Sequence, residues 1–215
     1  MRRFAAEGTQ KDLALCTQLF RLAPEKKLGL LLLKGFEEAF KGRSITGLPN
    51  ELIQEIAKLG GGSLQFAVRQ GREESVKKAI EVIQNPKSPV LDRVELIEIL
   101  GEAKQKSALP VFFQLLAKDK ENEQIYKASL TAMQSFKEDQ VAQEVVKRYN
   151  QFTPELREVA DTLLTSRKEW IKHWLEAVDR KEVNVQLITR PTILQMMQYP
   201  DDQVKGLVRK QWGDV

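Results

Sequence analysis

A helical unit that recurs about every thirty residues is the feature that most constrains the fold of this chain. Three segments with apolar residues at helical spacing begin at residues 91, 125 and 156, so the register steps are 34 and 31 residues. A short polar break and a second amphipathic segment follow each one. The first segments are Leu91–Leu100, Ile125–Met133 and Leu156–Leu164, and the second segments are Ala108–Leu116, Val141–Val146 and Trp170–Leu175. Paired helices that cannot bury their apolar faces alone stack on their neighbours, so the pattern predicts an all-α fold, an α-α superhelix of antiparallel helix pairs.

Proline and glycine residues punctuate this helical chain. We expect a single domain over residues 1–215, with divergent helices over 1–90, the clearest repeats over 91–180 and capping helices over 181–215. The segment Asn85–Pro89 precedes the clear repeats, and Gly60–Gly62 ends an earlier helix. The short stretch Leu64–Arg69 is expected to form a turn. Thr153 before Pro154 predicts a helix start, because a threonine N-cap accepts a backbone hydrogen bond and proline fits the first turn.

The composition is that of a folded protein with a charged surface, since 42% of the residues are hydrophobic and 30% are charged. The richest apolar run, Leu28–Leu33, ends at Lys34 and is far shorter than the ~20 residues that cross a bilayer. Glu7 and Asp12 interrupt any apolar signal segment after Met1. We therefore expect no insertion into a membrane and no export signal, and the sequence leaves the localisation open.

Basic residues outnumber acidic residues only slightly. There are 34 of the first and 30 of the second, which gives a net charge of +4 and a pI near 9.1. Such a charge permits nucleic-acid binding without requiring it. Several basic residues fall at expected helix C-termini: Lys104, Lys106, Lys118, Lys120, Lys147, Arg148, Arg180 and Lys181. Cations there interact favourably with the helix dipole and stabilise the helix by about 0.3–1 kcal/mol each. Helix stability therefore accounts for their positions, and we do not expect nucleic acid as the partner.

The residue types of catalytic and metal centres are scarce and scattered. The one histidine, His173, and the one cysteine, Cys16, are far apart, so neither a zinc-ligand spacing nor a Cys–His pair is present. We interpret His173 as a solvated side chain that can contact Glu169 one turn earlier. Met196 and Met197 lie at helical spacing with other apolar residues and are interpreted as core, as is Cys16. We expect no enzyme activity, no catalytic residue, no metal, no cofactor and no small-molecule substrate.

Two tryptophans admit two interpretations. Trp170 and Trp174 are one helical turn apart and share a face with Ile171, Leu175 and Val178, which favours burial in the core. The alternative is a pair of exposed indoles that stack on nucleic-acid bases beside neighbouring cations. The apolar neighbours favour the first interpretation.

The repeats resemble HEAT repeats. Leu156 and Arg157, followed by Val159 and Ala160, match the apolar-Arg start and small residues of a first HEAT helix. Ala108–Leu116 matches a second helix that begins with Ala, Leu and Pro. The resemblance implies a HEAT/armadillo-like solenoid of stacked antiparallel helix pairs.

The order of the segments resembles a narrower group, the HEAT-like region of large haem-binding dehydrogenase-like proteins of planctomycetes and related bacteria. The motifs that carry this resemblance are Ala5–Gly8, Phe40–Arg43, Leu64–Gly71, the Asn85–Pro86 break, Leu163–Arg167 followed by Trp170, and Gln211–Gly213. In that family the region joins a β-propeller, similar to sugar dehydrogenases, to a c-type cytochrome domain. The haem motif Cys-x-x-Cys-His has no match in this chain. The resemblance therefore implies a linking module without haem, periplasmic or exported if it belongs to such a parent protein.

These observations predict a non-catalytic protein-interaction or scaffold module. In stacked helix pairs the second helices line an extended concave face, along which a flanking domain or another subunit lies. The residues expected to make polar contacts on that face are Lys147, Arg148, Lys172 and Arg180. The alternative is a HEAT-like DNA-binding protein or alkylpurine DNA glycosylase, with Trp170, Trp174 and Asp161 beside the damaged nucleotide. The small net charge and the apolar neighbours of both indoles argue against it.

Overall fold

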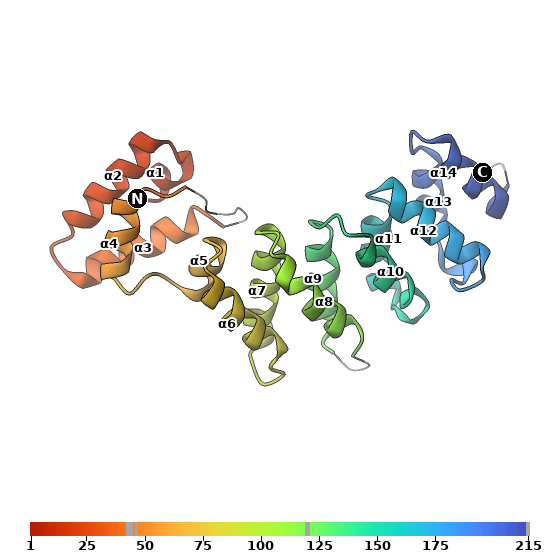
Figure 1. The fold of residues 1–215 in the computed structure, drawn as a ribbon, viewed down its shortest axis with the longest axis horizontal. Coiled ribbons are helices and arrows are strands. Elements are labelled where there is room, and N and C mark those ends of the chain that lie inside the picture. Colours follow the sequence, from red (N-terminus) through yellow and green to blue (C-terminus); the bar gives the residue numbers. More distant parts are fainter. Residues whose placement is uncertain (42–44, 46, 119–120, 214–215) are drawn as a thin grey trace. The chain divides into compact units, whose positions relative to one another are not determined.

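All regular structure in the described part of the chain is helical, as the repeat pattern predicts. The computed structural model describes residues 1–41, 45, 47–118 and 121–213, which form fourteen α-helices and three short 3-10 turns and contain no β-strand. Residues 42 and 43 of the Phe40–Arg43 motif, and Lys120, lie outside the described residues. The chain divides into two compact units, Met1–Ser88 and Pro89–Val215 (Figure 1), at the predicted Asn85–Pro89 break. The single domain expected over both units stays a prediction.

In the first unit, the described residues form six helices, of which the first five contribute to one apolar core. They are α1 (Arg2–Glu7), α2 (Gln10–Arg21), α3 (Lys26–Glu38), α4 (Asn50–Lys58), α5 (Leu64–Arg69) and α6 (Glu73–Gln84). Three rings meet in the core, since the ring centroid of Phe36 lies 6.1 Å from that of Phe20 and 5.8 Å from that of Phe66. The turn predicted over Leu64–Arg69 is wrong. The Ser63 hydroxyl accepts the backbone N–H of Phe66 and caps a short helix there.

The second unit consists of helix pairs stacked in sequence order. Its helices are α7 (Val90–Glu102), α8 (Leu109–Leu116), α9 (Glu123–Met133), α10 (Asp139–Val146), α11 (Pro154–Leu164), α12 (Lys168–Asp179), α13 (Arg190–Met197) and α14 (Asp202–Trp212). The first helices α7, α9 and α11 pack in succession, and so do the second helices α10, α12 and α14. Thr153 caps α11 as predicted, since its hydroxyl accepts the backbone N–H of Leu156. Stacking of equivalent helices is the arrangement of an α-solenoid.

A close approach between α7 and α9 depends on Gly101. A Cβ built on Gly101 would lie 2.7 Å from the Cβ and 2.8 Å from the Cα of Ala132. Non-bonded carbon atoms do not come this close, so a side chain at this position would push the helices apart. Glycine, which has no Cβ, permits the two helices to lie this close. The approach helps to enclose Ile97 and Leu100, which are fully buried.

Polar contacts tie neighbouring helix pairs of the second unit together. Asp161 on α11 accepts a hydrogen bond from Thr192 on α13, 31 residues later. Arg167 donates to the backbone carbonyl of Phe136, 31 residues earlier. Contacts separated by 31 or 32 residues also join Asn150 to Glu182, Lys172 to Gln203, and Asp179 to Lys210. Because these separations are about one repeat long, each contact joins one helix pair to the next.

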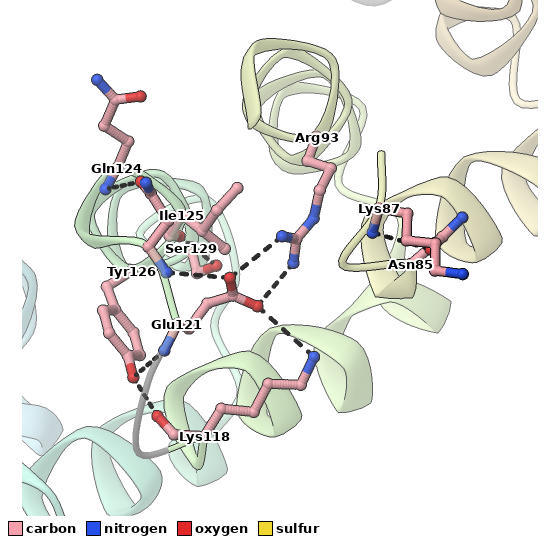
Figure 2. Close-up of polar contacts among 10 residues, drawn as sticks. Asn85, Lys87, Arg93, Lys118, Glu121, Gln124, Ile125, Tyr126 and Ser129 are labelled. Carbon is pink, nitrogen blue, oxygen red and sulfur yellow. Dashed lines mark hydrogen bonds and ion pairs between the residues drawn. The ribbon is translucent and has the colours of Figure 1, made fainter. Parts of the chain in front are cut away.

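Figure 2 shows a buried ion pair between α7 and the segment that leads into α9. Arg93 Nη1 lies 3.1 Å from Glu121 Oε1, and Arg93 Nη2 lies 2.7 Å from Glu121 Oε2. The two side chains are only 2% and 8% exposed. Glu121 also accepts the Asn122 N–H at 3.0 Å, and Lys118 Nζ lies 3.5 Å away. The hydrogen bonds from Arg93 contribute most to a pKa of Glu121 below its usual value.

Candidate functional site

A groove between α10 and α12 gathers polar side chains of the second helices. It encloses a volume of about 420 Å³ and is lined by Gln143, Val146, Lys147, His173, Arg180 and Glu182. The opposite sides of both helices face the core, where Val145 and Trp174 are fully buried. The helical period therefore leaves the polar side chains on the open side.

Carboxylates lie beside the cations of this groove. Lys147 Nζ is 2.7 Å from Glu144 Oε1, and Arg148 Nη1 is 2.7 Å from Glu144 Oε2. Arg180 binds Glu182 through Nε and Nη2, each at 2.9 Å. Burial opposes ionisation of Glu144, but the hydrogen bonds from Lys147 and Arg148 outweigh it and lower its pKa. The Arg180 hydrogen bond lowers the pKa of Glu182. Both carboxylates are thus ionised at neutral pH. Among the residues that line the groove, the two cations Lys147 and Arg180 accompany one carboxylate, Glu182, which leaves a positive excess.

The two cations that line the groove keep donors for a partner. The side chains of Lys147 and Arg180 are 63% and 49% exposed. The ammonium of Lys147 has three donors and uses one of them on Glu144. The guanidinium of Arg180 has five donors and uses two of them on Glu182. Spare donors together with a positive excess favour a carboxylate or a backbone carbonyl as the ligand.

The structure brings together two of the four residues predicted for the interaction face. Lys147 and Arg180 line the same groove. Arg148 donates to a carboxylate and a backbone carbonyl on its own helix, and it does not line the groove. Lys172 donates to Gln203 of α14, toward the following helix pair.

His173 lines the groove, whereas the sequence predicts only a solvated side chain. It lies seven positions before Arg180, which is two helical turns, so the two residues share a face of α12. This spacing was the available signal. What the sequence does not show is that α10 lies opposite that face.

The residues of the DNA-glycosylase alternative lie inside the second unit. Trp170 and Trp174 are 1% and 0% exposed, which confirms their interpretation as core. Asp161 is 6% exposed and accepts hydrogen bonds from the hydroxyls of Tyr149 at 2.6 Å and Thr192 at 2.7 Å. Burial raises the pKa of Asp161 although these hydrogen bonds oppose it. Because buried indoles cannot stack on a base, the geometry does not favour that alternative.

The residues that the structure describes contain no group of three or more His, Cys, Asp or Glu side chains placed to hold a metal ion. Their helices include none that combines the length and the apolar character needed to cross a bilayer. Cys16 and Met196 are fully buried, which confirms their interpretation as core, whereas Met197 is only partly buried.

Comparison with protein-family models, curated proteins and solved structures finds no match for this chain. The geometry of the α10–α12 groove is therefore the main basis for a functional proposal.

Proposed function

We propose that the chain is a non-catalytic interaction module whose second unit binds a partner protein along its second helices. The α10–α12 groove, about 420 Å³ in volume, is the observation that supports this most. Lys147 and Arg180 keep exposed donors at its edge, and their positive excess selects acidic side chains or chain carbonyls. Stacked helix pairs commonly use the repeated face of their second helices in this way.

The resemblance to HEAT repeats supports the same proposal and suggests the partner. In the haem-binding dehydrogenase-like proteins, the HEAT-like region lies between a β-propeller and a c-type cytochrome domain. On this proposal the partner is a flanking domain or another subunit of such an assembly. The redox chemistry belongs to that partner, and the solenoid holds no cofactor.

Photo-cross-linking in cells tests whether the groove meets a partner. A benzoylphenylalanine residue in place of Lys147 or Arg180 should cross-link to the same protein. The matched control places it at Glu155, an exposed position in the first turn of α11, and should not yield that product.

Calorimetry with the purified partner then tests the chemistry. Lys147→Glu combined with Arg180→Glu should weaken binding about tenfold or more, which is ~1.4 kcal/mol. Lys78→Glu changes the charge of an exposed lysine on α6 and should leave the affinity unchanged. The proposal fails if no product forms at either groove position, or if the charge reversal has no more effect than the control.

A further inference from the structure

Exposed leucines gather at the start of α3 in the first unit. Leu28 and Leu30 are each 44% exposed, Leu31 is 59% exposed, and Leu22, in the turn before α3, is 76% exposed. Isolated exposed leucines are ordinary, but four within ten residues form a concentrated apolar surface. None of the four is needed to fill the core of the unit.

Helix geometry places these leucines on the outer side of α3. The core-facing side is defined by Gly29, Leu33 and Phe36, which are buried. At about 100° per residue, Leu31 falls opposite that side, and Leu28 and Leu30 fall on its two flanks. The leucines therefore span the solvent-facing half of the first two turns.

The same half of the helix is basic, since Lys27 and Lys34 lie on it and are exposed. Lys26 is exposed beside them at the start of the helix. The ion pair found for α3 in the described part of the chain joins Glu38 to Lys41, with 2.8 Å between the charged atoms, and does not involve these three lysines. Glu37 accepts the backbone N–H of Ser63 at 2.8 Å, so this carboxylate is also engaged elsewhere. Glu25, just before the helix, offsets only part of the positive charge.

The position of Lys26 and Lys27 is not explained by helix stability. Both lie in the first turn of α3, which contains no acidic residue. Cations at a helix N-terminus oppose the helix dipole, at a cost of about 0.3–1 kcal/mol each when exposed. In the first unit, α2, α4 and α6 carry an acidic residue in the first turn, whereas α1 and α5, like α3, carry none. Lysines in this unfavourable position beside exposed leucines indicate an anionic ligand.

We propose that the leucine–lysine surface, composed of Leu22, Leu28, Leu30, Leu31, Lys26, Lys27 and Lys34, attaches the protein to an anionic lipid bilayer. The leucines enter the boundary between headgroups and acyl chains, while the lysines contact anionic headgroups. A fluid bilayer accepts protruding leucines without matching hollows, whereas a protein partner has to supply complementary shape. The attachment is peripheral, because the run Leu28–Leu33 is too short to span.

Flotation of the full chain with lipid vesicles tests this proposal. At low salt the protein should float with vesicles of phosphatidylcholine and phosphatidylglycerol in a 7:3 ratio, and not with phosphatidylcholine alone. Added salt should weaken the binding, since it screens the lysines. Lys27→Gln and Lys34→Gln should each lower the partition coefficient about fivefold. Leu28→Ser combined with Leu31→Ser should lower it about tenfold or more.

Matched controls change the same residue types outside the surface. Lys78→Gln and Leu91→Ser alter an exposed lysine and a leucine that is 75% exposed, and both should float like the unchanged protein. Leu31→Trp reports insertion directly, because its emission should shift to the blue with anionic vesicles only. The natural tryptophans, Trp170, Trp174 and Trp212, all lie in the second unit and provide the baseline.

Several results would overturn the proposal. One is the absence of flotation with anionic vesicles at low salt. Another is flotation that the paired leucine substitutions leave unchanged although circular dichroism shows a folded chain. A dimer, or binding to an acidic amphipathic peptide, that depends on these leucines and occurs without vesicle binding would assign the surface to a protein partner instead.

Discussion

The buried ion pair of Arg93 with Glu121 allows a direct test of how the second unit is held together. Arg93→Met keeps most of the apolar stem and removes the guanidinium, so Glu121 loses hydrogen bonds of 3.1 and 2.7 Å. Removing one partner of a buried pair costs about 3–5 kcal/mol, because the other charge remains buried. Lys118 and Asn122 still contact Glu121. We therefore expect a loss near the lower end, about 3 kcal/mol.

The loss should depend on pH in a defined direction. The pKa of Glu121 is lowered in the folded protein, chiefly by Arg93. The stabilisation from this group is therefore fully present above the unfolded pKa of about 4.3 and is lost as the pH falls through the lower folded value. The difference in unfolding free energy between the unchanged protein and Arg93→Met should be constant near neutral pH and shrink below about pH 4.

Urea unfolding followed by tryptophan fluorescence measures this difference, because all three tryptophans lie in the second unit. Lys106→Met is the control, since Lys106 is 79% exposed in its pair with Glu138, and it should cost less than about 1 kcal/mol. Arg93→Met combined with Glu121→Met removes both charges of the pair and should recover at least half of the loss. A loss below about 1 kcal/mol for Arg93→Met, or no recovery in the double variant, would refute the reasoning.

Substitutions at three further positions probe the packing and polar contacts of the second unit. Gly101→Val forces new carbon atoms against Ala132, at a position where even a Cβ would lie 2.7 Å from its neighbour, and should destabilise by about 1–3 kcal/mol in thermal unfolding. Asp161→Ala leaves the hydroxyls of Tyr149 and Thr192 without their acceptor and should cost about 1–3 kcal/mol. Asp161→Asn retains an acceptor and removes the buried charge, so it should cost less. The pKa of Asp161 is raised in the folded protein. The unchanged protein should therefore lose stability as the pH rises from the unfolded pKa of about 3.9 through the higher folded value. Asp161→Asn should lose less stability over this range, and equal pH profiles would contradict the argument. Thr153→Ala removes the N-cap of α11 and should cost about 1 kcal/mol, whereas Thr153→Ser should restore most of it.

Helix positions and their buried sides follow from local spacing and were therefore predictable. The predicted second segments Ala108–Leu116 and Val141–Val146 correspond to α8 and α10, although α10 begins two residues earlier, at Asp139. The burial of Trp170 and Trp174 follows because residues four apart share one side of a helix. These features need no knowledge of the neighbouring helix.

Contacts between helix pairs were not predictable, because they depend on how one pair lies on the next. Arg93 and Glu121 are 28 residues apart, and in the sequence each resembles an ordinary solvated charge. His173 belongs to the groove only because α10 lies opposite α12. The stretch Leu64–Arg69 spans too few residues for a helical period to be recognised.

The one-repeat spacing of the polar ties has a consequence for how the second unit opens. Each of these polar contacts joins a helix pair to its immediate neighbour along the stack. The last pair, α13 and α14, has a neighbour on one side only within this unit. Local unfolding should therefore begin at this pair and progress inward pair by pair. In a hydrogen-exchange experiment, the amide protons of α14 should exchange sooner than those of α9. Local unfolding of such a stack starts at the terminal helix pair, while the pairs in the middle stay folded.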